Sequence, residues 1–91
     1  MRLTPAILGT ALSLSQVAVL KFGEYPTASV NKHAGWLVLT WSKPYELEIR
    51  IREDGMINWY RTASGVSSGT EGWVRYQEGR NPMSEIGRAH V

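Results

Sequence analysis

The stretch YELEIRIREDGMINWYR, residues 45–61, decides the fold. Over residues 45–52 every odd position is apolar and every even position is charged. Because successive side chains of a strand point to opposite faces, this alternation predicts a β-strand with one face buried and the other in water. Residues 56–61 are again apolar, aromatic and polar in turn, and they predict a returning strand.

The turn between these strands is Glu53-Asp54-Gly55, and the side-chain pattern indicates its length. Directly opposed residues of an antiparallel pair share a face. A two-residue loop would oppose Ile51 to Asn58, an apolar to a polar residue. A three-residue loop with Gly55 in the left-handed conformation instead pairs like with like, namely Ile51 with Ile57, Ile49 with Trp59, Arg50 with Asn58 and Glu48 with Tyr60.

A third strand is expected before this hairpin, over the β-branched and aromatic residues 36–41. If residues 42–44 form the loop, Trp41 lies opposite Tyr45 and Leu39 opposite Leu47. Leu37 then lies opposite Ile49. The predicted core face consists of Leu37, Leu39, Trp41, Tyr45, Leu47, Ile49, Ile51, Ile57 and Trp59.

A helix is expected to cover this face. Thr4-Pro5 is a typical helix start, and Gly23 with Tyr25-Pro26 ends the apolar period. The predicted buried positions are Leu3, Ile7, Ala11, Leu14, Ala18 and Phe22, widened by Leu8, Leu12 and Val19. Residues 27–34 and the Ser/Gly/Thr-rich residues 62–72 are predicted to be loops, the second of them mobile, and residues 73–76 a short edge strand. The predicted fold is therefore α+β: an N-terminal helix packed on a three- to four-stranded antiparallel β-meander.

Chain length, cysteine content and net charge limit the possible functions. Ninety-one residues suffice for one domain, and the absence of cysteine excludes disulfides, thiolate metal sites and cysteine nucleophiles. A net charge of +2 is weak support for nucleic-acid binding. Polar residues interrupt the apolar stretch 3–20, so we expect neither a signal peptide nor a membrane span.

The final heptapeptide EIGRAHV, residues 85–91, resembles a translated sequencing adapter, since GAG ATC GGA AGA GCA CAC GTC encodes it. We therefore expect residues 1–84 to be the domain and residues 85–91 a non-native tail. On this reading we expect the chain to be of metagenomic origin and to lack its natural C-terminus.

Three segments, GWLVLTW (residues 35–41), LEIRI (47–51) and DGMINWY (54–60), carry a resemblance. They resemble a group of small prokaryotic proteins in which a G-x-h-x-L-x-W strand precedes an L-E-h-x-h strand and a D-G-x-h-x-W/Y turn, where h is hydrophobic. Thr40 stands where the group often has glutamate. The resemblance covers about a third of the chain and implies a cytoplasmic prokaryotic protein, but no activity.

The residues predict no catalytic centre, cofactor or metal. His33 is the only histidine before the tail, and no second ligand stands at a helical or hairpin spacing from it. The Gly/Ser-rich residues 64–70 lack the lysine of a phosphate-binding loop. Glu46 and Glu48 share a strand face with two arginines, where cross-strand ion pairs are a better reading than acid–base catalysis.

The outer sheet face is the candidate binding site. Aromatic and arginine side chains there are typical of a protein-binding hot spot, and also of platforms that stack single-stranded bases. A further alternative is that the chain covers this face itself, with Trp73-Val74 or a lost C-terminus. We expect a non-enzymatic protein-binding module of unknown partner and oligomeric state, by association an accessory of a mobile element or defence system. Weak nucleic-acid binding is second and an enzyme third. The candidate residues are Trp36, Val38, Glu48, Arg50, Arg52, Asn58 and Tyr60.

Overall fold

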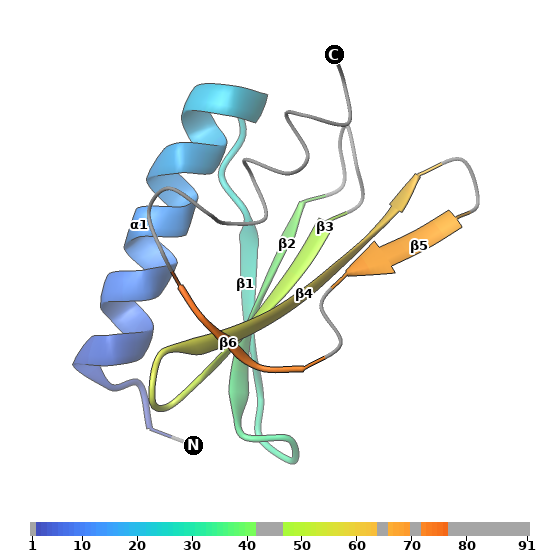
Figure 1. Ribbon diagram of the computed structural model, residues 1–91. Helices are drawn as coiled ribbons and strands as arrows, with labels where there is room; N and C mark the ends of the chain where they lie inside the picture. The colour runs from blue at the N-terminus through green and yellow to red at the C-terminus, as the bar shows by residue number, and fades with distance from the viewer. Residues whose placement is uncertain (1, 42–46, 64–65, 70–71, 77–91) are drawn as a thin grey trace.

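A single helix packs against one face of an antiparallel sheet (Figure 1). The computed structural model describes residues 2–41, 47–63, 66–69 and 72–76. Helix α1 spans Pro5–Phe22. Within the described residues the strands are β1 (Thr27–Asn31), β2 (Trp36–Trp41), β3 (Leu47–Arg52), β4 (Met56–Ala63), β5 (Val66–Gly69) and β6 (Val74–Arg75). The predicted α+β class is confirmed, with more strands than expected.

Helix α1 begins and ends where its capping residues predict. The Thr4 hydroxyl accepts a hydrogen bond from the Ile7 N–H at 3.2 Å, and Pro5 occupies the first turn, where its missing N–H leaves no bond unmade. At the other end Gly23 takes the left-handed conformation, with φ of 72°, and its N–H donates to the Val19 carbonyl at 2.9 Å.

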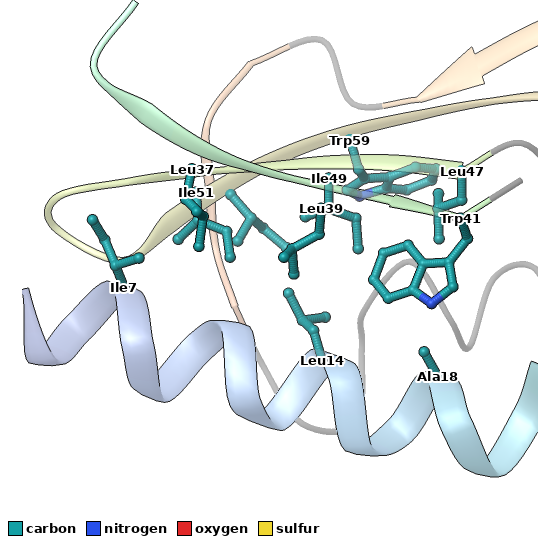
Figure 2. Close-up of a cluster of buried hydrophobic side chains, with 11 residues drawn as sticks. Ile7, Leu14, Ala18, Leu37, Leu39, Trp41, Leu47, Ile49, Ile51 and Trp59 are labelled. Carbon is teal, nitrogen blue, oxygen red and sulfur yellow. The ribbon is translucent and has the colours of Figure 1, made fainter. Parts of the chain in front are cut away.

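The core lies between α1 and the sheet (Figure 2). Ile7, Leu14 and Ala18 of the helix are fully buried against the sheet. The predicted Leu3 is half exposed instead, and so are Leu8 and Leu12, because they point beside the sheet and not into it. The buried sheet residues are Leu37, Leu39, Trp41, Leu47, Ile49, Ile51, Ile57 and Trp59, all of them predicted; the ninth predicted core residue, Tyr45, lies outside the described residues.

The β3–β4 hairpin has the predicted three-residue turn and register. Its pairs include Ile51–Ile57, Ile49–Trp59, Arg50–Asn58 and Glu48–Tyr60. Gly55 closes the turn with φ of 85°, and its N–H donates to the Arg52 carbonyl at 2.9 Å. The requirement that apolar residues share one face therefore correctly selects the three-residue turn over the two-residue turn.

The predicted β2–β3 register is wrong by two residues. Trp41 pairs with Leu47, Leu39 with Ile49 and Leu37 with Ile51. Five residues, 42–46, therefore separate the paired ends, where the sequence suggested a three-residue loop. Because a shift of two residues keeps every side chain on its own face, the predicted core and outer faces survive the error.

Residues 27–31 were predicted to be part of a loop but form β1, which pairs with β2 at the edge of the sheet. All five of its side chains are exposed, so the sequence carries no apolar alternation to reveal the strand. A short turn joins β1 to β2, in which the Asn31 side chain accepts a hydrogen bond from the Ala34 N–H at 3.0 Å.

The predicted loop over residues 62–72 is also partly wrong. Strand β4 continues to Ala63, and β5 returns antiparallel along its end, projecting away from α1 (Figure 1). The predicted edge strand is confirmed as β6, where Val74 pairs with Ile57. Strand β5 extends the sheet by pairing with β4, which the Ser- and Gly-rich composition of this segment does not indicate.

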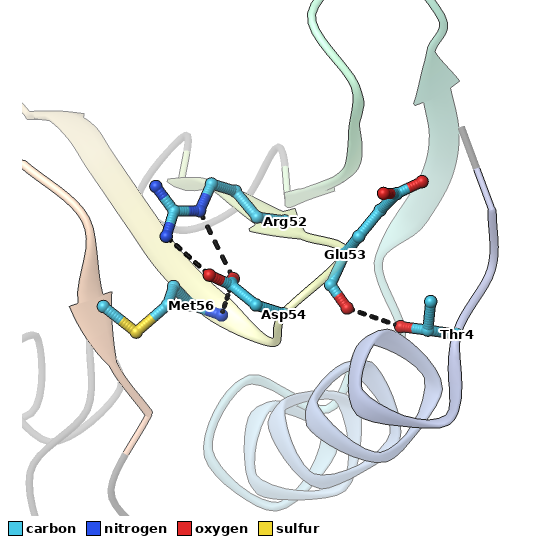
Figure 3. Close-up of polar contacts among 5 residues, drawn as sticks. All are labelled: Thr4, Arg52, Glu53, Asp54 and Met56. Atoms are coloured by element: carbon cyan, nitrogen blue, oxygen red, sulfur yellow. Dashed lines mark hydrogen bonds and ion pairs between the residues drawn. The ribbon is translucent and has the colours of Figure 1, made fainter.

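The β3–β4 turn is bound to the start of α1 (Figure 3). The Thr4 hydroxyl donates to the Glu53 carbonyl at 2.6 Å, and the Arg2 N–H donates to the Glu53 carboxylate at 2.6 Å. Gly55 lies against the helix, so that a Cβ added there would meet the Ala6 Cβ at 3.3 Å. These contacts fix the helix relative to the hairpin.

The prediction that no segment is apolar enough for a bilayer is too strict. Helix α1 meets the length and apolarity of a membrane-spanning helix. Signal sequences and the core helices of soluble proteins meet the same two criteria, so the match does not assign α1 to a membrane.

Candidate functional site

All seven predicted site residues lie on the sheet face opposite α1, and all are half-buried. Strand β2 supplies Trp36 and Val38, β3 supplies Glu48, Arg50 and Arg52, and β4 supplies Asn58 and Tyr60. The strand registers bring them together, since Arg50 lies between Val38 and Asn58 in the two neighbouring strands. We call this set, with Trp73 added below, the aromatic–arginine face.

Arg50 occupies the centre of the aromatic–arginine face. Its guanidinium carbon lies 5.6 Å from the ring centre of Trp36 and 5.0 Å from that of Tyr60, within the range of cation–π attraction. Its Nε donates to the Glu48 carboxylate at 2.8 Å, and the Tyr60 hydroxyl donates to the other oxygen of that carboxylate at 3.2 Å. One carboxylate thus holds both the arginine and the tyrosine in place.

Trp73 also belongs to this face. It was not among the residues that the sequence analysis predicted to form the site. Its ring lies 5.2 Å from the ring of Trp36, tilted by 50°, and the Arg52 guanidinium stacks on it at 5.0 Å. The Asn58 side chain donates to the Gly72 carbonyl at 3.3 Å, which ties the segment before Trp73 to β4. The chain therefore covers part of the face itself, one of the alternatives open from the sequence.

The ion pairs of this face run along β3 and its turn, not across strands as expected. Glu48 pairs with Arg50, and Arg52 pairs with Asp54 at 2.6 Å. The reason is in the register: Arg50 lies opposite Val38 and Asn58, which carry no charge. Side chains two residues apart on one strand share a face, so the nearest carboxylate belongs to the same strand.

An open pocket of about 380 Å³ lies at one end of this face. Two tryptophan rings, one guanidinium group and two acidic residues surround it. The pocket is lined by Ala34, Gly35, Trp36, Arg52, Glu53, Asp54 and Trp73. A side chain or small group of a ligand could enter between apolar ring surfaces and charged groups at this position.

Asp54 is one of the two carboxyl groups that line this pocket. Hydrogen bonds from the Arg52 guanidinium and from the Met56 N–H hold the pKa of its carboxyl below the ordinary value of 3.8 (Figure 3). Both bonds favour the charged form of the carboxyl. Arg52 is therefore engaged twice, by the carboxylate and by the Trp73 ring.

We expect Asp54→Asn to destabilise the protein at neutral pH and to have little effect in acid. A carboxyl with a lowered folded-state pKa stabilises the fold above its unfolded pKa, and this contribution disappears as pH falls through the folded pKa. Urea unfolding of both proteins at pH 7 and well below pH 3.8 measures the difference. An equal gap at both pH values would show that the charge of Asp54 is irrelevant.

The remaining chemistry is sparse. Among the described residues no group of three or more histidine, aspartate or glutamate side chains could hold a metal ion. His33, the one histidine considered from the sequence, is exposed in the turn after β1. Glu46 lies outside the described residues.

Comparison of the chain with protein-family models, with curated proteins and with solved structures finds no match.

Proposed function

We propose that this chain is a non-enzymatic protein-binding module, and that its partner contacts the aromatic–arginine face. The observation that carries the proposal is the contact of Trp36 with Trp73, half-exposed beside an open pocket. Tryptophan, tyrosine and arginine dominate the binding energy of protein interfaces. This face combines all three within a few ångströms.

The contacts within the face also favour tight binding. Arg50 is held by Glu48 and lies on two aromatic rings, so its long side chain has already lost much of its rotamer freedom. Ordering such a side chain at an interface costs about 0.5–1.5 kcal/mol of conformational free energy. Here the side chain is already ordered in the folded protein before a partner binds. A partner would meet a preformed surface.

The same contacts favour a protein over a nucleic acid. Arg50 and Arg52 each bind a carboxylate of their own strand or turn. A phosphate bound to either arginine would lie beside the carboxylate of Glu48 or Asp54, which would repel it. Single-stranded nucleic acid nevertheless remains the alternative from the sequence, and it predicts a different salt dependence.

Trp36→Ala should weaken partner binding strongly. Removing a central tryptophan of a hot spot typically costs 2 kcal/mol or more, which weakens binding about 30-fold. The tagged full chain is used to enrich partners, and the enriched protein is then titrated against both chains by calorimetry. Thr40→Ala is the matched control, because Thr40 is exposed at the other end of β2 and touches neither tryptophan ring in the contacts described above.

Two outcomes would contradict the proposal. A partner that binds Trp36→Ala and Trp73→Ala as tightly as the parent chain contacts another surface. Binding of a short oligo(dT) that weakens steeply with salt, and that disappears in the Arg50→Ala, Arg52→Ala double variant, would favour the nucleic-acid alternative. Circular dichroism of each variant shows whether the fold is retained.

A further inference from the structure

Helix α1 carries a second apolar seam that the sheet does not cover. Leu8 and Leu12 are 51% and 61% exposed, and with Ser15 and Val19 they follow the spacing i, i+4, i+7, i+11. This is the spacing by which one helix packs along another. The residues buried against the sheet, Ile7, Leu14 and Ala18, lie on a different side of the helix.

Beside this seam lies an apolar groove of about 570 Å³. One wall is α1, and the floor is the inner face of β2 and β1. On β1 the inward positions, Ala28 opposite Leu39 and Val30 opposite Leu37, are exposed because α1 does not reach over the edge strand. The groove is lined by Leu3, Leu8, Ala11, Leu12, Ser15, Tyr25, Pro26, Ala28, Leu37 and Leu39.

The charge pattern of this surface favours a second copy of the same chain. Residues 4–20 and residues 25–31 contain no Asp, Glu, Lys or Arg. In a two-fold contact the residues near the axis face their own copies, so a charge on the seam there would meet a like charge. A surface without charge avoids this repulsion, and its helical spacing fits an apolar helix such as α1 itself.

Two other occupants fit less well. A helix that lies on a lipid surface typically carries many lysines and arginines along its polar face, whereas α1 has only Arg2 just before it and Lys21 in its last turn. The chain's own residues 77–91, QEGRNPMSEIGRAHV, contain four charged residues and a proline, and cannot supply a continuous apolar face.

We propose that the chain forms a two-fold dimer in which the Leu8–Leu12 seam of α1 packs against the same seam of a second copy, with each helix closing the groove of the other. This contact is on the opposite side of the sheet from the aromatic–arginine face, so it does not depend on the proposed function. It leaves that face free in both copies.

Leu12→Glu should convert the dimer to a monomer. The parent chain is expected to sediment at twice its chain mass at micromolar concentration, and the variant at the chain mass, with a dissociation constant raised at least tenfold. Leu20→Glu is the matched control: Leu20 is 86% exposed on the same helix but does not line the groove. It should remain dimeric. Circular dichroism confirms that each variant is folded.

Cross-linking tests the contact without a destabilising charge. The chain has no cysteine, so Leu12→Cys creates a single reactive site. A short bis-maleimide should link two copies of Leu12→Cys efficiently and two copies of Leu20→Cys at least tenfold less. A parent chain that sediments as a monomer up to about 100 µM overturns the proposal. So does a monomer that binds phosphatidylglycerol vesicles through Leu12, since lipid would then be the occupant.

Discussion

Replacing Trp41 with alanine should lower the free energy of unfolding by about 3–5 kcal/mol, the range typical of a buried tryptophan. Trp41 is 1% exposed and lies between β2 and α1 (Figure 2). Its indole N–H also donates to the Glu24 carbonyl at 3.2 Å, just after the helix ends. Alanine would leave a cavity and an unpaired carbonyl, so most of the stability of so small a domain would be lost.

Urea unfolding followed by circular dichroism measures this loss. Thr40→Ala, at the neighbouring exposed position, should change stability by less than about 0.5 kcal/mol. Trp41→Phe keeps an aromatic ring and removes the hydrogen bond, so it should fall between the two. If Trp41→Ala were as stable as Thr40→Ala, the helix would not pack on the sheet as described.

Gly55→Val should be the second most damaging change, at about 2 kcal/mol or more. Gly55 has φ of 85°, a conformation that a β-branched residue resists. The structure adds a second reason that the sequence does not contain. A Cβ here would meet the Ala6 Cβ at 3.3 Å and the Ala6 carbonyl oxygen at 3.5 Å, so the turn and α1 would have to separate.

Replacing glycine with alanine should change stability in opposite directions at two positions. Gly9 is in the middle of α1, and nothing lies within 4 Å of a Cβ added there. Gly9→Ala should therefore stabilise the protein by up to about 1 kcal/mol, whereas Gly55→Ala should destabilise it. Thermal unfolding of both variants measures the two changes, and a stabilising Gly55→Ala would contradict both the positive φ and the contact with Ala6.

The core and the β3–β4 hairpin could be predicted because the pattern of apolar and polar residues close together in the sequence indicates them. The alternation over residues 45–61 favours a three-residue turn over a two-residue turn, and this choice places Ile49 opposite Trp59. Helix α1 was equally clear, since Thr4-Pro5 and Gly23 are strong end signals. The β2–β3 register failed because two loop lengths that differ by two residues bury the same side chains.

Strands β1 and β5 and part of the site could not be predicted, for related reasons. Strand β1 buries none of its side chains, so nothing in its sequence distinguishes it from a loop. The seven outer-face residues were found because they share the strand alternation of the core. Trp73 joins them through the path of the chain after β5, where residues far apart in sequence meet, and only its aromatic character pointed to it.

The hydrogen bond from Thr4 to Glu53 joins residues 49 positions apart, which has a consequence for synthesis on the ribosome. Helix α1 is translated first, but the hairpin that secures it is made about 50 residues later. At about 5–20 residues per second, a nascent helix without charge from Thr4 to Leu20 must wait roughly 3–10 s for its docking surface. We therefore expect the polypeptide to acquire its tertiary structure in one late step, once β4 has emerged.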